Sequence, residues 1–325
     1  PIPAALKQEL RNEVIAGLVV DDFRVAQRVL LTKNVSPSLG QFAIDRSLER
    51  YASVGVDGCV VVGRLDDSDT RAVRSVCRLP AGLAAEQFRF LNKDLFGICS
   101  DGELSVLVRW DLDQPGILPQ QMDAAQHLTG MDVNEEKQLV GWVSSKGEVS
   151  VHSLVSGETR TFGLERPAAG LRLSHSGEKV AVLCGNVVVV YDLASEKLVD
   201  ELVHVKRCKV LTVAWSPDDV DIATGTSIYL VHVWREYQSR SLPLTTLRGH
   251  QGQIVHVAFA DDGTKLISSS TDATSRIWSL LSNETILAGP VIVTQTHADN
   301  ADMAGVVDQS LARVVYHRPE QSRSV

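Results

Sequence analysis

The side chains of this chain that could do chemistry are nine histidines, five cysteines and one short run of lysine and arginine. The sequence contains no GxSxG nucleophile elbow, no GxxxxGK[ST] phosphate loop and no HExxH zinc pair. His204, His250 and His297 each precede a predicted first strand, in three well-separated segments, so they are not expected to share one metal ion. We therefore predict no enzymatic activity, no metal and no cofactor.

One group of charges differs from its surroundings. Lys206, Arg207 and Lys209 lie in one predicted connection between strands, and Arg248 lies in the equivalent later connection. The whole chain carries 32 Lys and Arg against 40 Asp and Glu, a net charge of −8, which argues against a surface that binds nucleic acid throughout. The four cations could form a docking point for an acidic or phosphorylated segment, an RNA contact, or a merely solvated loop.

Composition indicates a folded protein, because 44% of the 325 residues are hydrophobic and 22% are charged. The cysteine count is odd and no CxxC pair occurs, so reduced and mostly buried thiols are expected. No apolar run approaches the roughly 18 residues that cross a bilayer, and the polar N-terminal segment does not resemble a secretory signal. These observations predict an intracellular protein of the cytoplasm or nucleus with no membrane contact.

A repeated pattern of strands and turns decides the expected fold. The clearest unit runs from Leu247 to Leu280, with strands at Ile254–Phe259 and Lys265–Ser269 and a third strand that ends at Trp278. Aligned turns between second and third strands recur at intervals of 36 to 45 residues. They lie at Asp57, Asp101, Lys146, Asn186, Ser227, Asp272 and Asp308. Turns between first and second strands, such as Asp261-Asp262-Gly263, and between third and fourth strands recur in the same order.

This period is typical of a β-propeller blade, and a generic β-sandwich lacks such ordering. We predict an all-β fold, a single seven-bladed β-propeller of four-stranded antiparallel blades with a short N-terminal helix. The predicted regions are an N-terminal helical extension at 1–22, the propeller at 23–318 and a C-terminal tail at 319–325. The stretch from Arg24 to Lys33 alternates and is expected to complete the last blade, whereas Pro3 to Ala16 has helical spacing.

The third strands carry a further signature. They end in Trp110-Asp111, Tyr191-Asp192, Trp234-Arg235 and Trp278-Ser279. Together with Gly249-His250 these dipeptides resemble the WD-repeat β-propeller family. The resemblance implies a buried hydrogen-bond chain of His250, Ser268, Asp272 and Trp278, with Ser269 as the alternative serine. No other unit shows a complete set, so the remaining blades are expected to depend on hydrophobic packing.

The resemblance implies a non-enzymatic protein-interaction scaffold within a larger intracellular assembly, whose partners are other proteins. The alternative is a component of an RNA or ribonucleoprotein complex that binds through the basic loops; a propeller enzyme with a site at the channel mouth is a third reading. The segment Asp308-Gln309-Ser310-Leu311 is similar to a turn in the propeller of the splicing-associated ubiquitin ligases. Because equivalent connections share one face of a propeller, Lys206, Arg207 and Lys209 are expected beside Arg248.

Overall fold

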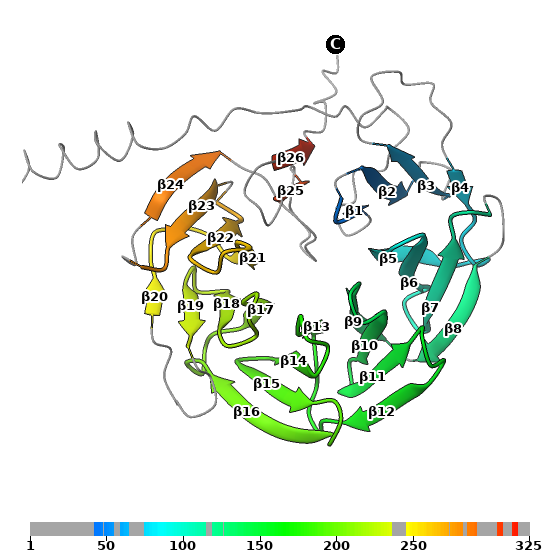
Figure 1. The fold of residues 1–325 in the computed structure, drawn as a ribbon, viewed down its shortest axis with the longest axis horizontal. Coiled ribbons are helices and arrows are strands. Elements are labelled where there is room, and N and C mark those ends of the chain that lie inside the picture. Colours follow the sequence, from blue (N-terminus) through cyan, green and yellow to red (C-terminus); the bar gives the residue numbers. More distant parts are fainter. Residues whose placement is uncertain are drawn as a thin grey trace, which may run out of the picture.

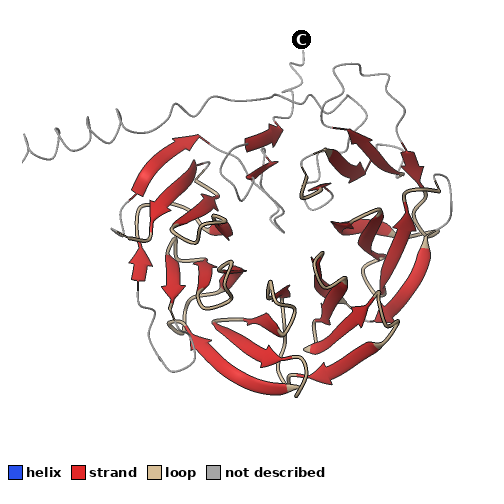
Figure 2. Ribbon diagram, in the orientation of Figure 1, coloured by secondary structure: helices blue, strands red, loops and turns tan. Residues whose placement is uncertain are grey.

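The computed structural model describes residues 42–47, 49–54, 59–64, 75–114, 119–125, 127–235, 245–272, 274–281, 285–290, 304–307 and 314–317. Every regular element in these ranges is a β-strand (Figure 2). None of them is a helix long and apolar enough to cross a membrane. The predicted helix from Pro3 to Ala16, the predicted strand from Arg24 to Lys33, and the turn residues Asp57 and Asp308 lie outside the described residues.

The described strands form six four-stranded antiparallel sheets and one two-stranded sheet, each made of consecutive strands. The first sheet is β1 Phe42–Ile44, β2 Arg50–Val54, β3 Val60–Arg64 and β4 Ser75–Cys77. The second is β5 Ala84–Leu91, β6 Asp94–Ser100, β7 Ser105–Asp111 and β8 Gln120–Ala125. The third is β9 Leu128–Asn134, β10 Leu139–Ser144, β11 Glu148–Ser153 and β12 Thr159–Gly163. The fourth is β13 Gly170–Leu173, β14 Lys179–Cys184, β15 Val187–Asp192 and β16 Lys197–Val203.

The chain continues in the same way through two more sheets. The fifth is β17 Val210–Trp215, β18 Ile222–Thr226, β19 Val231–Trp234 and β20 Thr245–Leu247. The sixth is β21 Ile254–Phe259, β22 Lys265–Ser270, β23 Thr274–Ser279 and β24 Thr285–Pro290. The two-stranded sheet pairs β25 Ala304–Val307 with β26 Val314–His317. Within the described residues, the prediction of an all-β fold built from four-stranded antiparallel sheets is confirmed.

The turns that end these strands follow from their residue types. Asp101 accepts hydrogen bonds from the backbone N–H groups of Glu103 and Leu104 at 2.9 and 2.8 Å, which closes the β6–β7 turn. Gly147 ends the β10–β11 turn with φ +87°, and a Cβ atom there would lie 2.0 Å from the carbonyl oxygen of Arg166. Such turns reverse the chain sharply, so each sheet is completed locally before the next begins.

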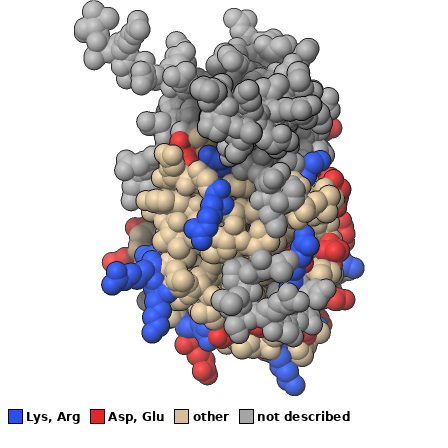
Figure 3. Space-filling view, turned by 90° about the vertical axis from the view of Figure 1, so that its left-hand side faces the viewer, with Lys and Arg blue, Asp and Glu red and all other residues tan. Residues whose placement is uncertain are grey.

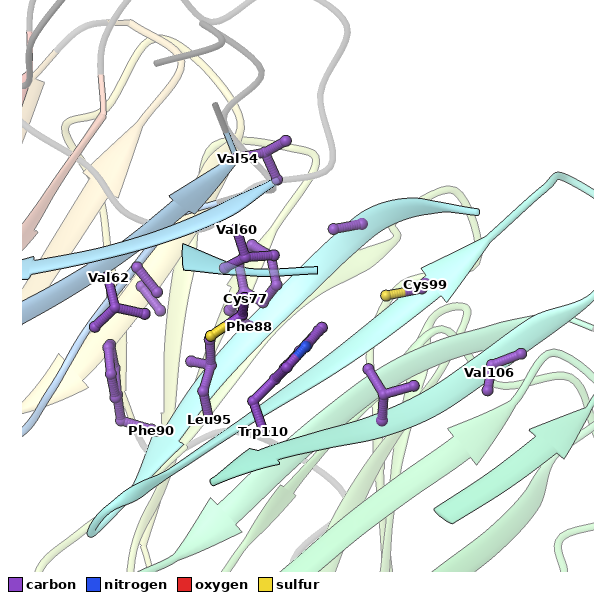
Figure 4. Packing of buried hydrophobic residues seen from close by; sticks show 14 residues of the cluster. Val54, Val60, Val62, Cys77, Phe88, Phe90, Leu95, Cys99, Val106 and Trp110 are labelled. Carbon is purple, nitrogen blue, oxygen red and sulfur yellow. The ribbon is translucent and has the colours of Figure 1, made fainter. Parts of the chain in front are cut away.

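The sheets are arranged around a central axis with their first strands innermost (Figure 1). Neighbouring first strands are in contact: β5 with β1 and β9, β13 with β9 and β17, and β17 with β21. The core consists of apolar clusters, and the cluster between the first two sheets includes Val60, Cys77, Phe88 and Trp110 (Figure 4). Because the second to fifth sheets each pack on a neighbour through both faces, their strands bury side chains on both faces.

Candidate interaction site

A hydrogen-bond chain crosses the sixth sheet from its entry connection to its third strand. The indole Nε1 of Trp278 donates to Ser268 Oγ at 2.8 Å, and Ser268 Oγ lies 2.8 Å from His250 Nε2. The other ring nitrogen, Nδ1, lies 3.0 Å from Asp272 Oδ2. Since Nδ1 faces a carboxylate, it carries the proton, and Nε2 accepts from the serine hydroxyl. The four residues singled out from the sequence are joined in this order, and Ser269 instead bonds to Ser275 at 2.6 Å.

Asp272 also fixes the connection that leads into this sheet. Its Oδ2 accepts from the backbone N–H of Gln251 at 2.7 Å, and its Oδ1 accepts from Thr274 N–H at 2.9 Å. Burial alone would raise the pKa of Asp272, but hydrogen bonds from Thr274, Gln251 and His250 lower it to about 2. The carboxylate is therefore ionised, and it holds the segment just after Arg248 in one conformation.

The fifth sheet contains a second chain that sequence reasoning missed. Trp234 Nε1 donates to Thr224 Oγ1 at 3.1 Å, and Thr224 Oγ1 lies 2.8 Å from His204 Nε2. No aspartate takes part; His204 Nδ1 lies 3.2 Å from the carbonyl oxygens of Asn186 and Leu202. Burial lowers the pKa of His204 to about 4, so the ring is neutral.

The two chains share one sequence signal. In each, the hydroxyl residue precedes the tryptophan by ten positions, as the pairs Thr224–Trp234 and Ser268–Trp278 show. A histidine also lies in the connection before the first strand of each sheet. The fifth sheet lacks the complete set with Gly-His and Asp, because backbone carbonyl oxygens there take the place of the carboxylate beside the histidine.

The predicted partner-binding residues lie in the connections that these histidines anchor. Lys206, Arg207 and Lys209 are exposed and lie between β16 and β17. Arg248 is exposed and lies between β20 and β21. His204 at the start of the first connection and His250 in the second are buried. Each connection therefore has a fixed base and exposed cations.

His232 of β19 shows that the two connections are near each other. Its ring centroid lies 5.2 Å from that of His204, and its Nδ1 lies 3.0 Å from Thr246 Oγ1 of β20. Burial, His204 and the positive charge of Arg248 together lower the pKa of His232 to about 4. His232 thus contacts His204 at the start of one connection and Thr246, which lies two residues before Arg248 of the other.

Exposed apolar side chains accompany the cations. Val205 is 65% exposed beside Lys206, and Leu211 is 37% exposed just after Lys209. Tyr229, in the β18–β19 turn, is 46% exposed. Backbone hydrogen bonds join this turn to the connection, since Ser227 N–H donates to the Lys209 carbonyl at 2.9 Å. Tyrosine, arginine and apolar groups on one rigid surface are typical of sites that bind proteins.

The charges on the rim are not evenly mixed. Figure 3 shows several Lys and Arg side chains gathered at one edge of this side of the molecule, with Asp and Glu more frequent at the opposite edge. Within the described part of the chain, no group of three His, Cys, Asp or Glu could hold a metal ion.

Comparisons with known proteins agree with this geometry. The family model described as WD domain, G-beta repeat matches residues 241–279, which include β20 to β23 and the whole His250 chain. Residues 241–279 of this chain therefore match a WD repeat.

The WD-repeat relatives match only parts of the chain. WD repeat-containing protein 1 of Rattus norvegicus is 28% identical over 180 residues, which is 53% of this chain and 27% of that protein. The Denticleless protein homolog of Danio rerio is 29% identical over 117 residues, 34% of this chain and 18% of that protein. Actin-interacting protein 1-2 of Arabidopsis thaliana is 37% identical over 93 residues, 28% of this chain and 15% of that protein. The chain spans about a quarter or less of the length of these relatives.

Proposed function

We propose that this WD-repeat chain is a non-enzymatic, intracellular protein-interaction scaffold that binds an acidic or phosphorylated segment of a partner protein. The binding surface is the basic connection surface, defined here as Val205, Lys206, Arg207, Lys209, Leu211, Tyr229 and Arg248. WD-repeat relatives support the scaffold role, since a propeller presents variable loops on a rigid disc. The fold alone does not determine which partner binds, so we infer the kind of partner from the residues of this surface.

We also propose that the ring has seven blades and that β25 and β26 belong to the seventh. Six four-stranded sheets precede this pair in the chain. In Figure 1 the pair lies between the sixth sheet and the first, where a closing blade would stand. The strand predicted from Arg24 to Lys33 would complete that blade, and this remains a prediction.

The observation that carries the functional proposal is the position of His232 between His204 and Thr246. His232 lies 5.2 Å from His204, and its Nδ1 lies 3.0 Å from Oγ1 of Thr246, two residues before Arg248. These contacts support one surface for cations that are separate in sequence. Like charges at short range raise the local concentration of anions, and arginine can hold a carboxylate or phosphate through two hydrogen bonds. The exposed side chains of Val205, Leu211 and Tyr229 add apolar contact area, which favours a protein segment over RNA.

A direct binding experiment tests this proposal. We would measure by fluorescence anisotropy the binding of a labelled peptide of alternating Glu and Leu with one phosphoserine, at low salt. The variant Lys206→Glu, Arg207→Glu and Lys209→Glu should bind at least tenfold more weakly and keep the wild-type Tm, because exposed substitutions change stability by less than about 0.5 kcal/mol. A matched control is Lys93→Glu, Lys197→Glu and Lys265→Glu, which makes the same charge change at the opposite ends of the strands.

The outcomes separate the competing interpretations. Equal peptide affinity for the wild type and the first variant would reduce the connections to solvated loops. Tighter binding of an oligouridine RNA than of the peptide, lost in the same variant, would replace the proposal by the ribonucleoprotein alternative. Affinity purification with mass spectrometry, using wild type and both variants, would then identify the partner that the first variant alone loses.

A further inference from the structure

A cavity of about 240 Å³ lies between the innermost strands β5, β9, β13, β17 and β21. Among the described residues that line it, the charged ones are Arg89 and Arg172, His256 is a further titratable one, and none is a carboxylate. Gln253 and Leu211, which also line it, follow directly on the basic connections, so one end of the cavity faces the same side of the disc. This arrangement is cationic in a protein whose net charge is −8.

Irregular pairing at one level of the inner strands produces the lining. The register with the second strand shifts between Ala85 and Gln87 in β5, between Val210 and Thr212 in β17, and between Ile254 and His256 in β21. In β9 the same shift falls between Leu128 and Gly130. A bulge re-aims the side chain that follows it. Gln87, Thr212 and His256 consequently line the same cavity.

One carboxylate serves both arginines. Asp132 Oδ1 lies 3.8 Å from Arg89 Nε and 3.4 Å from Arg172 Nη1. Its Oδ2 accepts from the Leu173 backbone N–H at 3.0 Å. Burial and the neighbouring Arg172 charge lower the pKa of Arg89 to about 9, against the opposing effect of Asp132. Arg89 and Arg172 also line a neighbouring cavity with Asp132 and four further carboxylates, Asp45, Glu135, Glu136 and Asp261, whereas no described carboxylate lines the cavity of about 240 Å³.

His256 contributes a polar atom with no partner. Its Nδ1 is buried and makes no hydrogen bond within the described part of the protein. Burial, Arg172 and Arg89 lower the pKa of His256 to about 3, so the ring is neutral and can donate one N–H. An unpaired buried donor costs free energy unless a ligand or water satisfies it.

Two glycines shape the wall of the cavity, and only one of them, Gly170, leaves room for a ligand. A Cβ atom on Gly130 would lie 2.8 Å from Gly170 Cα, so β9 and β13 approach too closely for a side chain there. A Cβ atom on Gly170 would meet only Leu183 Cδ1, at 3.9 Å, so the cavity wall is open at this point. The cavity is therefore open beside Gly170, two residues before Arg172 in β13.

We propose that this cavity binds a phosphate-class oxyanion, held by the guanidinium groups of Arg89 and Arg172 and by the ring of His256. Guanidinium forks match the geometry of phosphate oxygens, and a bound anion would occupy the side of the two arginines that no described carboxylate lines. The source of the phosphate can be the free anion or a phosphoserine side chain. Arg89, Arg172 and His256 do not belong to the basic connection surface, which meets the cavity at Leu211, and the site does not depend on the function proposed for that surface.

Thermal unfolding of the whole chain with added inorganic phosphate tests the site, at ionic strength matched with potassium chloride. A ligand that binds the folded state raises Tm with concentration. Wild type should show this rise, and calorimetric titration should give a phosphate affinity at least tenfold tighter than that of Arg172→Met. Arg160→Met, on the exposed outer strand β12, should keep the wild-type affinity. The variant Lys206→Glu, Arg207→Glu and Lys209→Glu should also keep it, which separates this site from the surface.

A second variant covers the case in which Arg172→Met does not fold. Gly170→Val keeps both arginines and adds a side chain where only Leu183 is near, so it should fold and weaken phosphate binding by obstructing the cavity. Titration with O-phosphoserine in place of phosphate distinguishes the two sources, since equal affinity would show that an organic phosphate also fits. The proposal is overturned if wild type shows no phosphate-dependent rise in Tm, or if Gly170→Val and Arg172→Met both bind phosphate as wild type does.

Discussion

Asp219, in the turn after β17, reaches into the preceding sheet and holds His175. Its Oδ1 accepts from the His175 backbone N–H at 2.7 Å and lies 3.2 Å from the ring Nδ1, while Oδ2 accepts from Ser176 N–H at 2.7 Å. Burial alone would raise the pKa of Asp219, but these bonds lower it to about 2. The hydrogen bond to Asp219 in turn raises the pKa of His175. Two sheets are thus joined by a charged contact.

Asp219→Asn should lower the free energy of unfolding by about 1–3 kcal/mol, because its amide would place an N–H group against the Ser176 N–H. Asparagine tolerates the backbone conformation of this residue, φ 58°, so strain does not confuse the result. The neighbouring control is Asp218→Asn. Asp218 accepts through Oδ1 alone, from Ser216 and Val220 within its own turn, and should tolerate the amide. Urea unfolding of both variants measures the difference in their free energies of unfolding. Equal midpoints would mean that the contact of Asp219 with His175 and Ser176 contributes no more than the turn around Asp218.

Acid should destabilise the protein over two ranges of pH. His204 and His232 have folded-state pKa values of about 4, below the ordinary 6.5, so the unfolded chain binds more protons and stability falls from about pH 6.5 to pH 4. Asp219 and Asp272, with pKa values lowered from 3.8 to about 2, add stability above pH 3.8 that is lost as pH falls towards 2. His175, whose pKa is raised, acts in the opposite direction.

Melting curves between pH 7.5 and 4.5 check the histidine contribution. His232→Asn removes one of the histidines with a lowered pKa, so its Tm should fall less over this range than that of wild type. Lys197→Met, at an exposed lysine outside both hydrogen-bond chains, should follow the wild-type slope. A His232→Asn slope equal to wild type would show that this buried histidine does not resist protonation.

Asp272→Ala should destabilise the protein more than Asp101→Ala. Asp272 binds His250 and Gln251 across the sheet, whereas Asp101 binds only N–H groups of its own turn. Losing Asp272 leaves buried donors unpaired, at about 1–3 kcal/mol for each. Asp57 lies in an aligned turn of the sequence, and we expect Asp57→Ala also to destabilise the protein less than Asp272→Ala. Calorimetric Tm values for the three variants decide it, and similar losses in all would argue against a special role for the His250 chain.

Thr224→Val should cost about 2–4 kcal/mol, because the nearly isosteric change leaves both His204 Nε2 and Trp234 Nε1 without a partner. Thr212→Val is a matched control on the adjacent strand. The Thr212 side chain is buried, but its hydroxyl bonds to none of the described residues. Guanidinium unfolding should separate the two variants clearly. Similar stabilities would mean that the second chain contributes little.

Binding of the acidic peptide should weaken as salt rises, because the cations of the basic connection surface are exposed and are screened over roughly 8–10 Å at physiological ionic strength. The variant with Lys206, Arg207 and Lys209 reversed should show a flatter dependence on salt. Anisotropy titrations at several chloride concentrations measure both slopes. Parallel slopes would assign the attraction to charges elsewhere.

The sequence predicted the architecture well because turn chemistry is local. Asp101, Lys146, Asn186, Ser227 and Asp272 all lie between the second and third strands of their sheets. The His250 chain was equally accessible, since its members belong to one repeat with a recognisable spacing. Trp234 is recognisable in the sequence as the end of a strand, but its link to His204 is not. His204 bonds to backbone carbonyl groups, and these do not depend on residue type, so they leave no sequence signature.

The meeting of the charged residues at the cavity cannot be predicted in the same way. Arg89, Asp132 and Arg172 come from three different sheets, and Arg172 and Asp132 are 40 residues apart. Their meeting depends on the register of each inner strand relative to the next, which the bulges change by one residue. No pattern within a single repeat contains that information.

Side-chain hydrogen bonds between neighbouring sheets also determine which parts of the propeller can unfold locally. Asn134 donates to the carbonyl oxygens of Ser174 and His175 at 2.7 and 2.9 Å, and Asp219 holds that same turn from the other side. The turn between β13 and β14 is therefore hydrogen-bonded to the third and the fifth sheets. We expect the third, fourth and fifth sheets to unfold as one cooperative unit. Opening any one of them exposes charged or amide groups of the other two. Amide protons throughout these three sheets should then exchange with solvent through a shared opening event, at a common free-energy cost.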